Sequence, residues 1–219
     1  MSSDDFLSSL TGEEKEFFAS FHRPIDIQRF LDTVRYNDGY NWKSPRQALL
    51  EGTANCGEGA LIAAAAFKFM GAEPLVMDMG VVDDDDHLVA LFKHDGHWGA
   101  VAKSNTTLLR FREPVFRSVR ELAMSYFEFY FNVKGFKSLR RFSLPINLDG
   151  LEPRDWVTTA ADLNIYNEQF ARLPYESILT IKMEENLTIA EPDVRKACFL
   201  GASKTGLYVP PGCDIEELV

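Results

Sequence analysis

The sequence predicts an α+β fold with one hydrophobic core. Helical patterns dominate the first part of the chain, whereas runs of alternating apolar and polar residues, typical of strands, cluster in its middle. The chain has 219 residues, of which 46% are hydrophobic. That is enough apolar side chain to fill the core of one large domain, so a disordered chain is excluded.

Three short helices are expected at the start of the chain. Thr11 and Glu14 form a capping box for the first, and Pro24 occupies the first turn of the second, where a helix tolerates proline. The third begins at Ser44-Pro45 and ends near Gly52. The expected ranges are 11–21, 24–36 and 44–52.

A fourth helix, over residues 56–70, is apolar on nearly all faces and is therefore expected to be central and buried. Asn55 is a suitable N-cap residue, and Glu58 stands where a capping box needs a carboxylate. Gly71 is a natural terminator. Cys56 consequently occupies the first position of a buried helix.

The strands that follow predict an antiparallel sheet. Asp95-Gly96, flanked by alternating residues, is a strong hairpin signal. The expected strands are 74–82, 87–93 and 98–103. Four aspartates (83–86) fill the turn before the second strand. A solvated turn is the default interpretation, and Ca²⁺ or Mg²⁺ binding through clustered oxygens is the alternative.

The remaining chain predicts mixed structure. Ser118 and Glu121 cap an aromatic helix that runs to about residue 132, and Asp149-Gly150 marks a turn. Further elements are expected as strands at 141–146 and 177–182 and helices at 160–173 and 192–200. We therefore divide the chain into N-terminal helices (1–36), a core (37–146) and a C-terminal α/β extension of the same domain (147–219).

Composition and charge narrow the classes of partner and the cellular location that we expect for the protein. The net charge is −10 and no long Lys/Arg run occurs, which disfavours nucleic-acid binding. The N-terminus is polar, and no apolar run reaches the ~18 residues that a membrane span needs, so we expect a cytoplasmic protein without a membrane partner. Three widely spaced cysteines (Cys56, Cys198 and Cys213) argue against a disulfide framework.

Cys56 and His87 are the residues that most suggest chemistry. The first turn of a helix presents unpaired N–H groups and a partial positive charge, which favour a thiolate over a thiol. A histidine that arrives later from a strand is the usual proton acceptor for such a nucleophile. Gly57, beside the cysteine, is small enough to let a substrate backbone approach.

Residues 36–105 resemble the core of the transglutaminase-like superfamily, which has a papain-like fold. The resemblance rests on Leu49-x-x-Gly52-x-x-x-Cys56-x-x-x-Ala60-Leu61-x-x-Ala64, on Gly71-Ala72 and a strand, and on His87-Leu88-Val89-Ala90-Leu91 followed by Asp95-Gly96 and Trp98. It implies that Cys56 opens a helix packed on a sheet that carries His87. It also implies that an Asp on the next strand orients the imidazole, and it implies no cofactor or metal.

One position departs from the family pattern. The expected Asp falls at Ala102, and alanine cannot orient an imidazole. The hairpin register places Ser104 directly opposite His87. Asn105 is chemically better suited, since papain-like enzymes can use Asn in this role, and it needs only a twist at the strand end. Both stay candidates.

Stabilising an oxyanion requires N–H donors close to the sulfur. The backbone N–H of Cys56 is one candidate. The family often draws a second donor from an aromatic or amide side chain upstream. Trp42 ranks first because of its indole N–H, with Tyr40 and Gln47 as alternatives.

The resemblance implies a cysteine-dependent acyl-transfer enzyme that works through a thioester. With water as acceptor it is a peptidase or amidase acting on a peptide or a small amide or ester, which we favour, and with an amine it is a transferase. Ala102 motivates an alternative, a catalytically inactive peptide-binding module on the same fold. A relative of arylamine acetyltransferases is a third possibility, but Gly52-Thr53-Ala54-Asn55 replaces the Arg-Gly-Gly step of that family.

Overall fold

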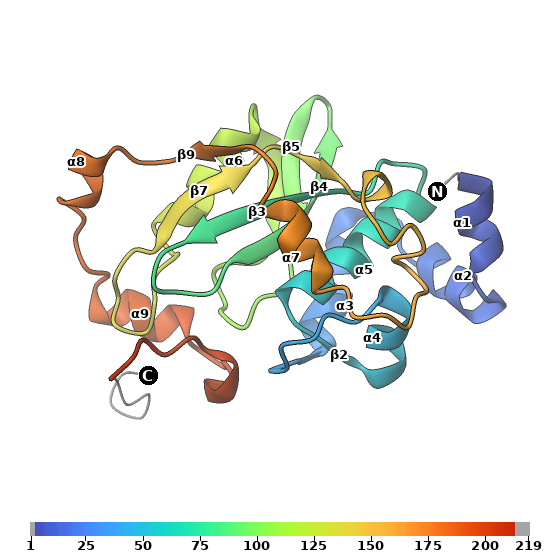
Figure 1. The fold of residues 1–219 in the computed structure, drawn as a ribbon, viewed down its shortest axis with the longest axis horizontal. Helices are drawn as coiled ribbons and strands as arrows, with labels where there is room; N and C mark the ends of the chain where they lie inside the picture. Colours follow the sequence, from blue (N-terminus) through green and yellow to red (C-terminus); the bar gives the residue numbers. More distant parts are fainter. Residues whose placement is uncertain (1–2, 213–219) are drawn as a thin grey trace.

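A computed structural model describes residues 3–212, which form an α+β fold around a seven-stranded antiparallel sheet (Figure 1). The sheet runs in the order β6 (Arg112–Phe116), β5 (His97–Val101), β4 (His87–His94), β3 (Leu75–Val81), β7 (Leu139–Ser143) and β9 (Tyr175–Ser177), with β8 (Ile146–Asn147) paired to the first residues of β3. The helices of the N-terminal part lie at one end of the sheet, and the last helices lie at the other.

The four predicted N-terminal helices begin where the capping signals place them, and they are preceded by a short helix that was not predicted. In chain order these helices are α1 (Ser3–Ser9), α2 (Gly12–Ala19), α3 (Pro24–Thr33), α4 (Pro45–Glu51) and α5 (Cys56–Phe69). Both predicted capping boxes are present, at Thr11 and at Asn55. Gly52 ends α4 with a φ of 65°, which is accessible to glycine at little cost.

Helix α3 ends earlier than predicted because the chain extends at Val34 and forms a short parallel pair of strands. These are β1 (Arg35–Tyr36) and β2 (Thr53–Ala54). The last carbonyls of α3 are satisfied by a distant side chain, since the Lys103 ammonium donates to the carbonyls of Leu31 and Val34. Burial lowers the pKa of that lysine to about 8.

Helix α5 is the buried centre of the fold, as predicted. Its residues 57–68 are all buried, and it packs on β4. Leu61 and Ile62 are fully inaccessible, and burial of each such side chain stabilises the fold by about 2 kcal/mol. A Cβ on Gly59 would lie 2.2 Å from the Lys103 Cβ, so glycine lets the segment that follows β5 approach the helix closely.

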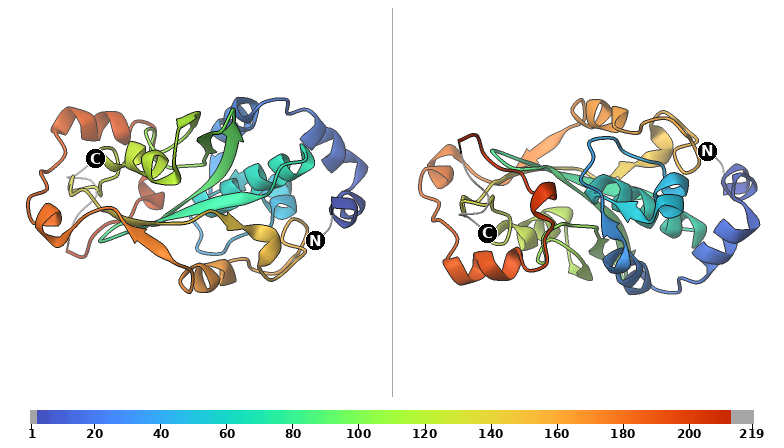
Figure 2. Two further views of the ribbon diagram at one scale, coloured as in Figure 1. Left: turned by 90° about the horizontal axis from the view of Figure 1, so that it is seen from above. Right: turned by 90° about the horizontal axis from the view of Figure 1, so that it is seen from below.

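Both faces of the central strands are covered. Val76 and Leu88 belong to a cluster with α5 and α7 (Ile165–Phe170), whereas Met77 and Val89 point to a second cluster under α6 (Val119–Phe127). Figure 2 shows α6 and α7 on opposite sides of the sheet. The first cluster extends from Phe6 to Phe170, so all three parts of the predicted division contribute to one core.

The C-terminal half departs most from the predicted elements. Helix α6 ends at Phe127, earlier than predicted, and the chain then turns through Gly135 (φ 86°) within an isolated bridge between Phe131 and Lys137. The expected strand at 177–182 is instead β9 followed by helix α8 (Ile181–Glu184), which Thr180 caps. Helix α9 (Pro192–Cys198) lies near its predicted place, and α7 is shorter than predicted.

The end of β5 matters for the site. The hairpin register is as predicted, with His94 opposite His97 and Ala90 opposite Val101. The strand stops at Val101, because the buried Gln28 carboxamide on α3 takes both the N–H and the carbonyl of Ala102 at 3.0 and 2.9 Å. Residues after Ala102 therefore leave the sheet before they reach the level of His87.

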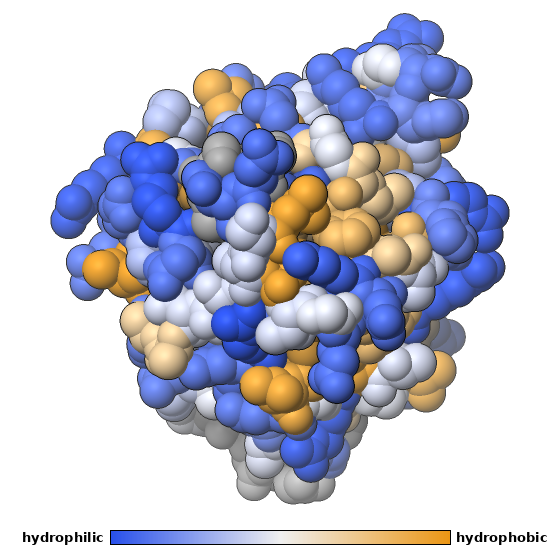
Figure 3. Space-filling model, turned by 90° about the vertical axis from the view of Figure 1, so that its right-hand side faces the viewer, coloured by the Kyte–Doolittle hydropathy of each residue, from blue (hydrophilic) through white to orange (hydrophobic). Residues whose placement is uncertain are grey.

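The surface seen from the helical end is hydrophilic at its edges, with one continuous apolar area near the centre of the view and smaller ones elsewhere (Figure 3). Within residues 3–212, every helix is too short or too polar to cross a membrane.

Candidate functional site

The first turn of α5 is anchored by one buried carboxylate. Glu58 accepts hydrogen bonds from the backbone N–H groups of Asn55 (2.8 Å) and Lys43 (2.9 Å) and from the Asn37 carboxamide (2.9 Å). The Asn55 side chain in turn accepts from the Glu58 N–H at 3.0 Å. The segment before α4 is thereby fixed beside Cys56.

Cys56 and His87 both line one cavity, which we term the inner cavity. Its volume is about 60 Å³, and its walls include Tyr36, Cys56, Asp84, His87, Asn105, Leu109 and Tyr130. The Cys56 thiol donates to the Asp86 carbonyl at 3.7 Å, and Asp86 immediately precedes His87 at the start of β4. The structure therefore brings the predicted sulfur and imidazole to the same cavity.

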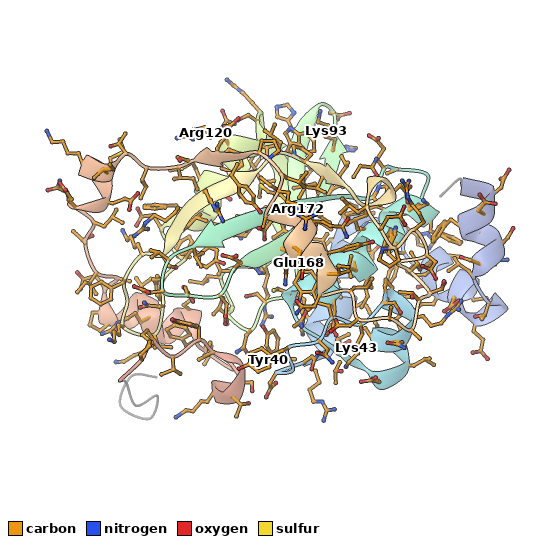
Figure 4. All side chains as sticks on the ribbon, in the orientation of Figure 1. Tyr40, Lys43, Lys93, Arg120, Glu168 and Arg172 are labelled. Carbon is orange, nitrogen blue, oxygen red and sulfur yellow. The ribbon has the colours of Figure 1, made fainter. Side chains whose placement is uncertain are left out.

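Cys56 also lines a larger, open cavity of about 800 Å³, which we term the outer groove. Its walls include Tyr36, Asp38, Tyr40, Trp42, Asp78, Asp85, Asp86, Arg141, Tyr175 and residues 205–209. Tyr40, on the segment between β1 and α4, is 92% exposed (Figure 4). The sulfur thus stands between a small chamber that contains the imidazole and a groove large enough for a substrate.

The imidazole of His87 is held by a backbone carbonyl. Its Nε2 lies 2.8 Å from the Leu109 carbonyl oxygen, and because that oxygen only accepts, Nε2 carries the proton. Nδ1 then holds the lone pair and has no hydrogen-bond partner within residues 3–212. The rings of Tyr126 and Tyr130 pack edge-on, with centroids 6.4 and 6.3 Å away.

Neither predicted orienting residue bonds the imidazole, which corrects that expectation. Ser104 and Asn105 both line the inner cavity, but the Ser104 hydroxyl pairs with Thr106, and the Asn105 carboxamide pairs with the backbone of Ser203. The early end of β5 at Val101 removes Ser104 from its place opposite His87. A backbone carbonyl carries no signal in the sequence, so Leu109 was not predictable.

The candidate oxyanion donors fall in different places. The Trp42 ring packs on Gly57 and lines the outer groove, and a Cβ on Gly57 would lie 2.5 Å from that ring. Gly57 is therefore small to admit Trp42, rather than a substrate backbone. Tyr40 lines the groove, whereas Gln47 on α4 lines neither cavity.

The electrostatics differ from the predicted thiolate. Burial raises the pKa of the Cys56 thiol to about 12, and the nearby Asp85 and Asp78 carboxylates add to this rise, against the N–H groups of Leu88 and Gly57. Burial lowers the pKa of His87 to about 4. The pair at neutral pH is thus a neutral thiol beside a neutral imidazole, because the desolvation cost exceeds the stabilisation by the helix terminus.

The aspartate turn is structured by its neighbours rather than simply solvated. Tyr130 donates to the Asp85 carbonyl at 2.6 Å, and the Ser138 hydroxyl donates to the Asp84 carboxylate at 2.6 Å. Burial raises the pKa of Asp84 to about 7 and that of Asp78 to about 6. Within residues 3–212, no group of three or more His, Cys, Asp or Glu side chains is placed to hold a metal ion.

Of the other two cysteines, Cys198 lines neither the inner cavity nor the outer groove. Cys198 is fully buried in α9, where its thiol donates to the Phe129 carbonyl at 3.7 Å. Cys213 lies outside the described residues.

No model of a known protein family matches the chain, and comparison with curated proteins finds no significant match.

Proposed function

We propose that the protein is a cysteine-dependent acyl-transfer enzyme of transglutaminase-like type, and that it acts as a peptidase or amidase. One observation supports this most strongly. The Cys56 sulfur, in the first turn of a buried helix, lines the same cavity as an imidazole whose Nδ1 is free to accept a proton. The outer groove gives that sulfur access to a substrate.

In the proposed reaction the Cys56 sulfur attacks the carbonyl carbon of an amide or ester while His87 Nδ1 takes the thiol proton. The N–H groups of the first turn of α5 stabilise the oxyanion, and the Trp42 indole is the candidate second donor. The imidazolium then gives its proton to the leaving amine or alcohol, which leaves a thioester on Cys56. Water attacks the thioester carbon while His87 Nδ1 takes a proton from the water. The carbon–sulfur bond then breaks, the imidazolium returns that proton to the Cys56 sulfur, and the acid is released with the thiol and the neutral imidazole restored.

The neutral resting pair makes this a base-assisted attack. Proton transfer accompanies formation of the carbon–sulfur bond, since a free thiolate is scarce at neutral pH. The Leu109 carbonyl fixes the tautomer and stabilises the imidazolium through the Nε2 hydrogen bond, in place of a carboxylate. A carbonyl lacks a full negative charge, so this assistance is weaker than that of an Asp.

The experiment is hydrolysis of activated aryl esters and of a mixed peptide substrate, with mass spectrometry to trap an acyl adduct on Cys56. C56A and H87A are expected to abolish turnover, and the adduct must form on the peptide that contains Cys56. Cys198→Ala and H94A serve as controls for a thiol and an imidazole that line neither cavity. Turnover that persists in C56A would refute the proposal.

A second candidate is a binding module without turnover, which Ala102 and the raised pKa of Cys56 favour. The two are separated by one comparison. A module binds peptide in the outer groove and protects Cys56 from alkylation, but it never releases a product and forms no acyl adduct.

A further inference from the structure

The chain crosses its own site near the C-terminus. Residues 203–209, which we term the strap, run between the 36–38 segment and Asn105, and residues 206–208 line both the inner cavity and the outer groove. Cys56 lines the same two spaces. The strap therefore covers part of the entrance to the sulfur.

The Asn105 carboxamide holds the strap by its main chain. Nδ2 donates to the Ser203 carbonyl at 2.8 Å, and Oδ1 accepts from the Ser203 N–H at 2.8 Å. Both polar atoms of one residue's backbone are thus paired with one side-chain amide. Because both hydrogen bonds go to backbone atoms, the contact does not depend on the side chain at position 203, and an extended peptide of another sequence could make the same two bonds.

The next residues fit the strap closely to the wall of the site. A Cβ on Gly206 would lie 2.8 Å from the Tyr36 ring and 3.1 Å from the Asn105 carboxamide nitrogen, so only glycine passes here. Thr205 donates to the Asp38 carboxylate. Leu207 then continues in extended conformation (φ −101°, ψ 138°).

The strap lies at the surface of the fold and contributes no residue to the main core cluster, although Leu207 packs against the small cluster around Phe131 and Phe199. Apart from the short 3₁₀ turn Lys204–Gly206 it has no regular structure, and all its residues keep some exposure. Segments with few buried contacts open at low free-energy cost. The strap can therefore leave the site without unfolding the core.

We infer that Asn105 is a backbone clamp for a peptide bound beside Cys56, and that Ser203 of the strap occupies this clamp until a substrate displaces it. The inference rests on the proposed function, because a peptide bound beside Cys56 would be its substrate. Whether Asn105 holds the strap over the sulfur can be tested without enzymatic turnover, by measuring how fast Cys56 is alkylated.

The test uses the full chain and two variants that release the strap in different ways. Gly206→Leu places a side chain against Tyr36 and the Asn105 carboxamide and so displaces the strap, while Asn105 itself is unchanged. Asn105→Asp keeps the shape of the clamp but replaces its N–H donor by a carboxylate that repels the Ser203 carbonyl. Gly150→Leu is the matched control, since nothing lies within 4 Å of a Cβ at that position. The readout is the rate of Cys56 alkylation by iodoacetamide at mildly alkaline pH, from peptide mass spectrometry.

Both strap variants are expected to react about tenfold faster than wild type, and Gly150→Leu at the wild-type rate. A synthetic peptide of residues 202–209, blocked at both ends, should then protect Gly206→Leu but not Asn105→Asp. The same peptide methylated on the Ser203 nitrogen should protect neither, because it lacks the N–H that Oδ1 accepts. Near-UV circular dichroism and urea unfolding confirm that each variant is folded.

Two results would overturn the inference. One is a wild-type alkylation rate in folded Gly206→Leu, which would mean that the strap does not cover the sulfur. The other is equal protection of both variants by the peptide, which would mean that Asn105 is not the clamp. If both strap variants are alkylated faster and the peptide protects only Gly206→Leu, but no ester or peptide is hydrolysed, the clamp is supported and the proposed enzymatic function is refuted.

Discussion

At the scale of single residues, the candidate site combines a half-buried cysteine, a buried histidine and carboxylates on the groove side. The positions of Cys56 and His87 in the fold were predictable, because a helix-capping pattern places Cys56 at the start of α5 and a strand pattern places His87 at the start of β4. Their ionisation was not, since it depends on how deeply the fold buries both groups and on where Asp78 and Asp85 lie. Desolvation is a property of the assembled structure, and a local motif does not encode it.

The neutral pair predicts the pH dependence of Cys56 reactivity. Because the thiol pKa is raised and the imidazole pKa is lowered, the thiolate fraction at neutral pH is small and grows as pH rises toward about 12. The alkylation rate is therefore expected to rise continuously through the alkaline range. A pH–rate profile with iodoacetamide measures it, and a plateau beginning near pH 6 would indicate a thiolate–imidazolium pair instead.

A substitution of Asp85 is expected to change the pKa of the Cys56 thiol without altering Cys56 or His87 themselves. Its carboxylate raises the pKa of Cys56, so Asp85→Asn is expected to lower that pKa and to accelerate alkylation at a fixed mildly alkaline pH. Asp95→Asn, at the exposed tip of the β4–β5 hairpin, is the charge-matched control. An equal acceleration in both variants would assign the effect to the net charge of the molecule rather than to the neighbourhood of the sulfur.

At the scale of elements, capping chemistry predicted the helix starts, and tertiary contacts decided the ends. Asn55 with Glu58 and Thr11 with Glu14 act within one turn, so the sequence contains the whole signal. The end of β5, by contrast, depends on Gln28 reaching Ala102 from another helix. Such a contact joins residues far apart in the chain and has no local pattern.

A substitution of Glu58 tests how strongly its carboxylate anchors the first turn of α5. Glu58→Ala leaves the N–H groups of Asn55 and Lys43 without their acceptor, and each buried unsatisfied donor costs about 1–3 kcal/mol. We expect the free energy of unfolding to fall by roughly 3 kcal/mol, together with a change in Cys56 reactivity as the first turn of α5 loosens. Urea denaturation measures the stability. Glu13→Ala, an exposed residue of α2, should have little effect, and a similarly mild effect of Glu58→Ala would contradict this role.

At the scale of the whole molecule, the predicted α+β class is confirmed, and the C-terminal part is where prediction was weakest. Its helices α7 and α8 have six and four residues, too short for a clear apolar period. The path of residues 203–209 back to Cys56 depends on contacts with Asn105 and Tyr36 that only the folded chain provides. The core itself was predictable, because α5 is apolar on all sides.

Leu61 tests how much that core contributes. It is fully buried in α5, and Leu61→Ala is expected to destabilise the protein by about 3 kcal/mol through lost burial and the cavity left behind. Leu50→Ala on α4 is the matched control, since Leu50 is 81% exposed. Thermal or urea unfolding compares the two, and equal effects would contradict a central place for α5.

The main-chain partner of His87 has a consequence for genetics. A scan that replaces every residue of the 102–110 segment one at a time never deletes the oxygen at position 109, because each substituted amino acid still supplies its own. Such a survey would identify no residue in this segment that orients the His87 imidazole. Only shortening or lengthening that loop, or an ester in place of the following amide bond made by chemical ligation to weaken the acceptor, would reveal the dependence.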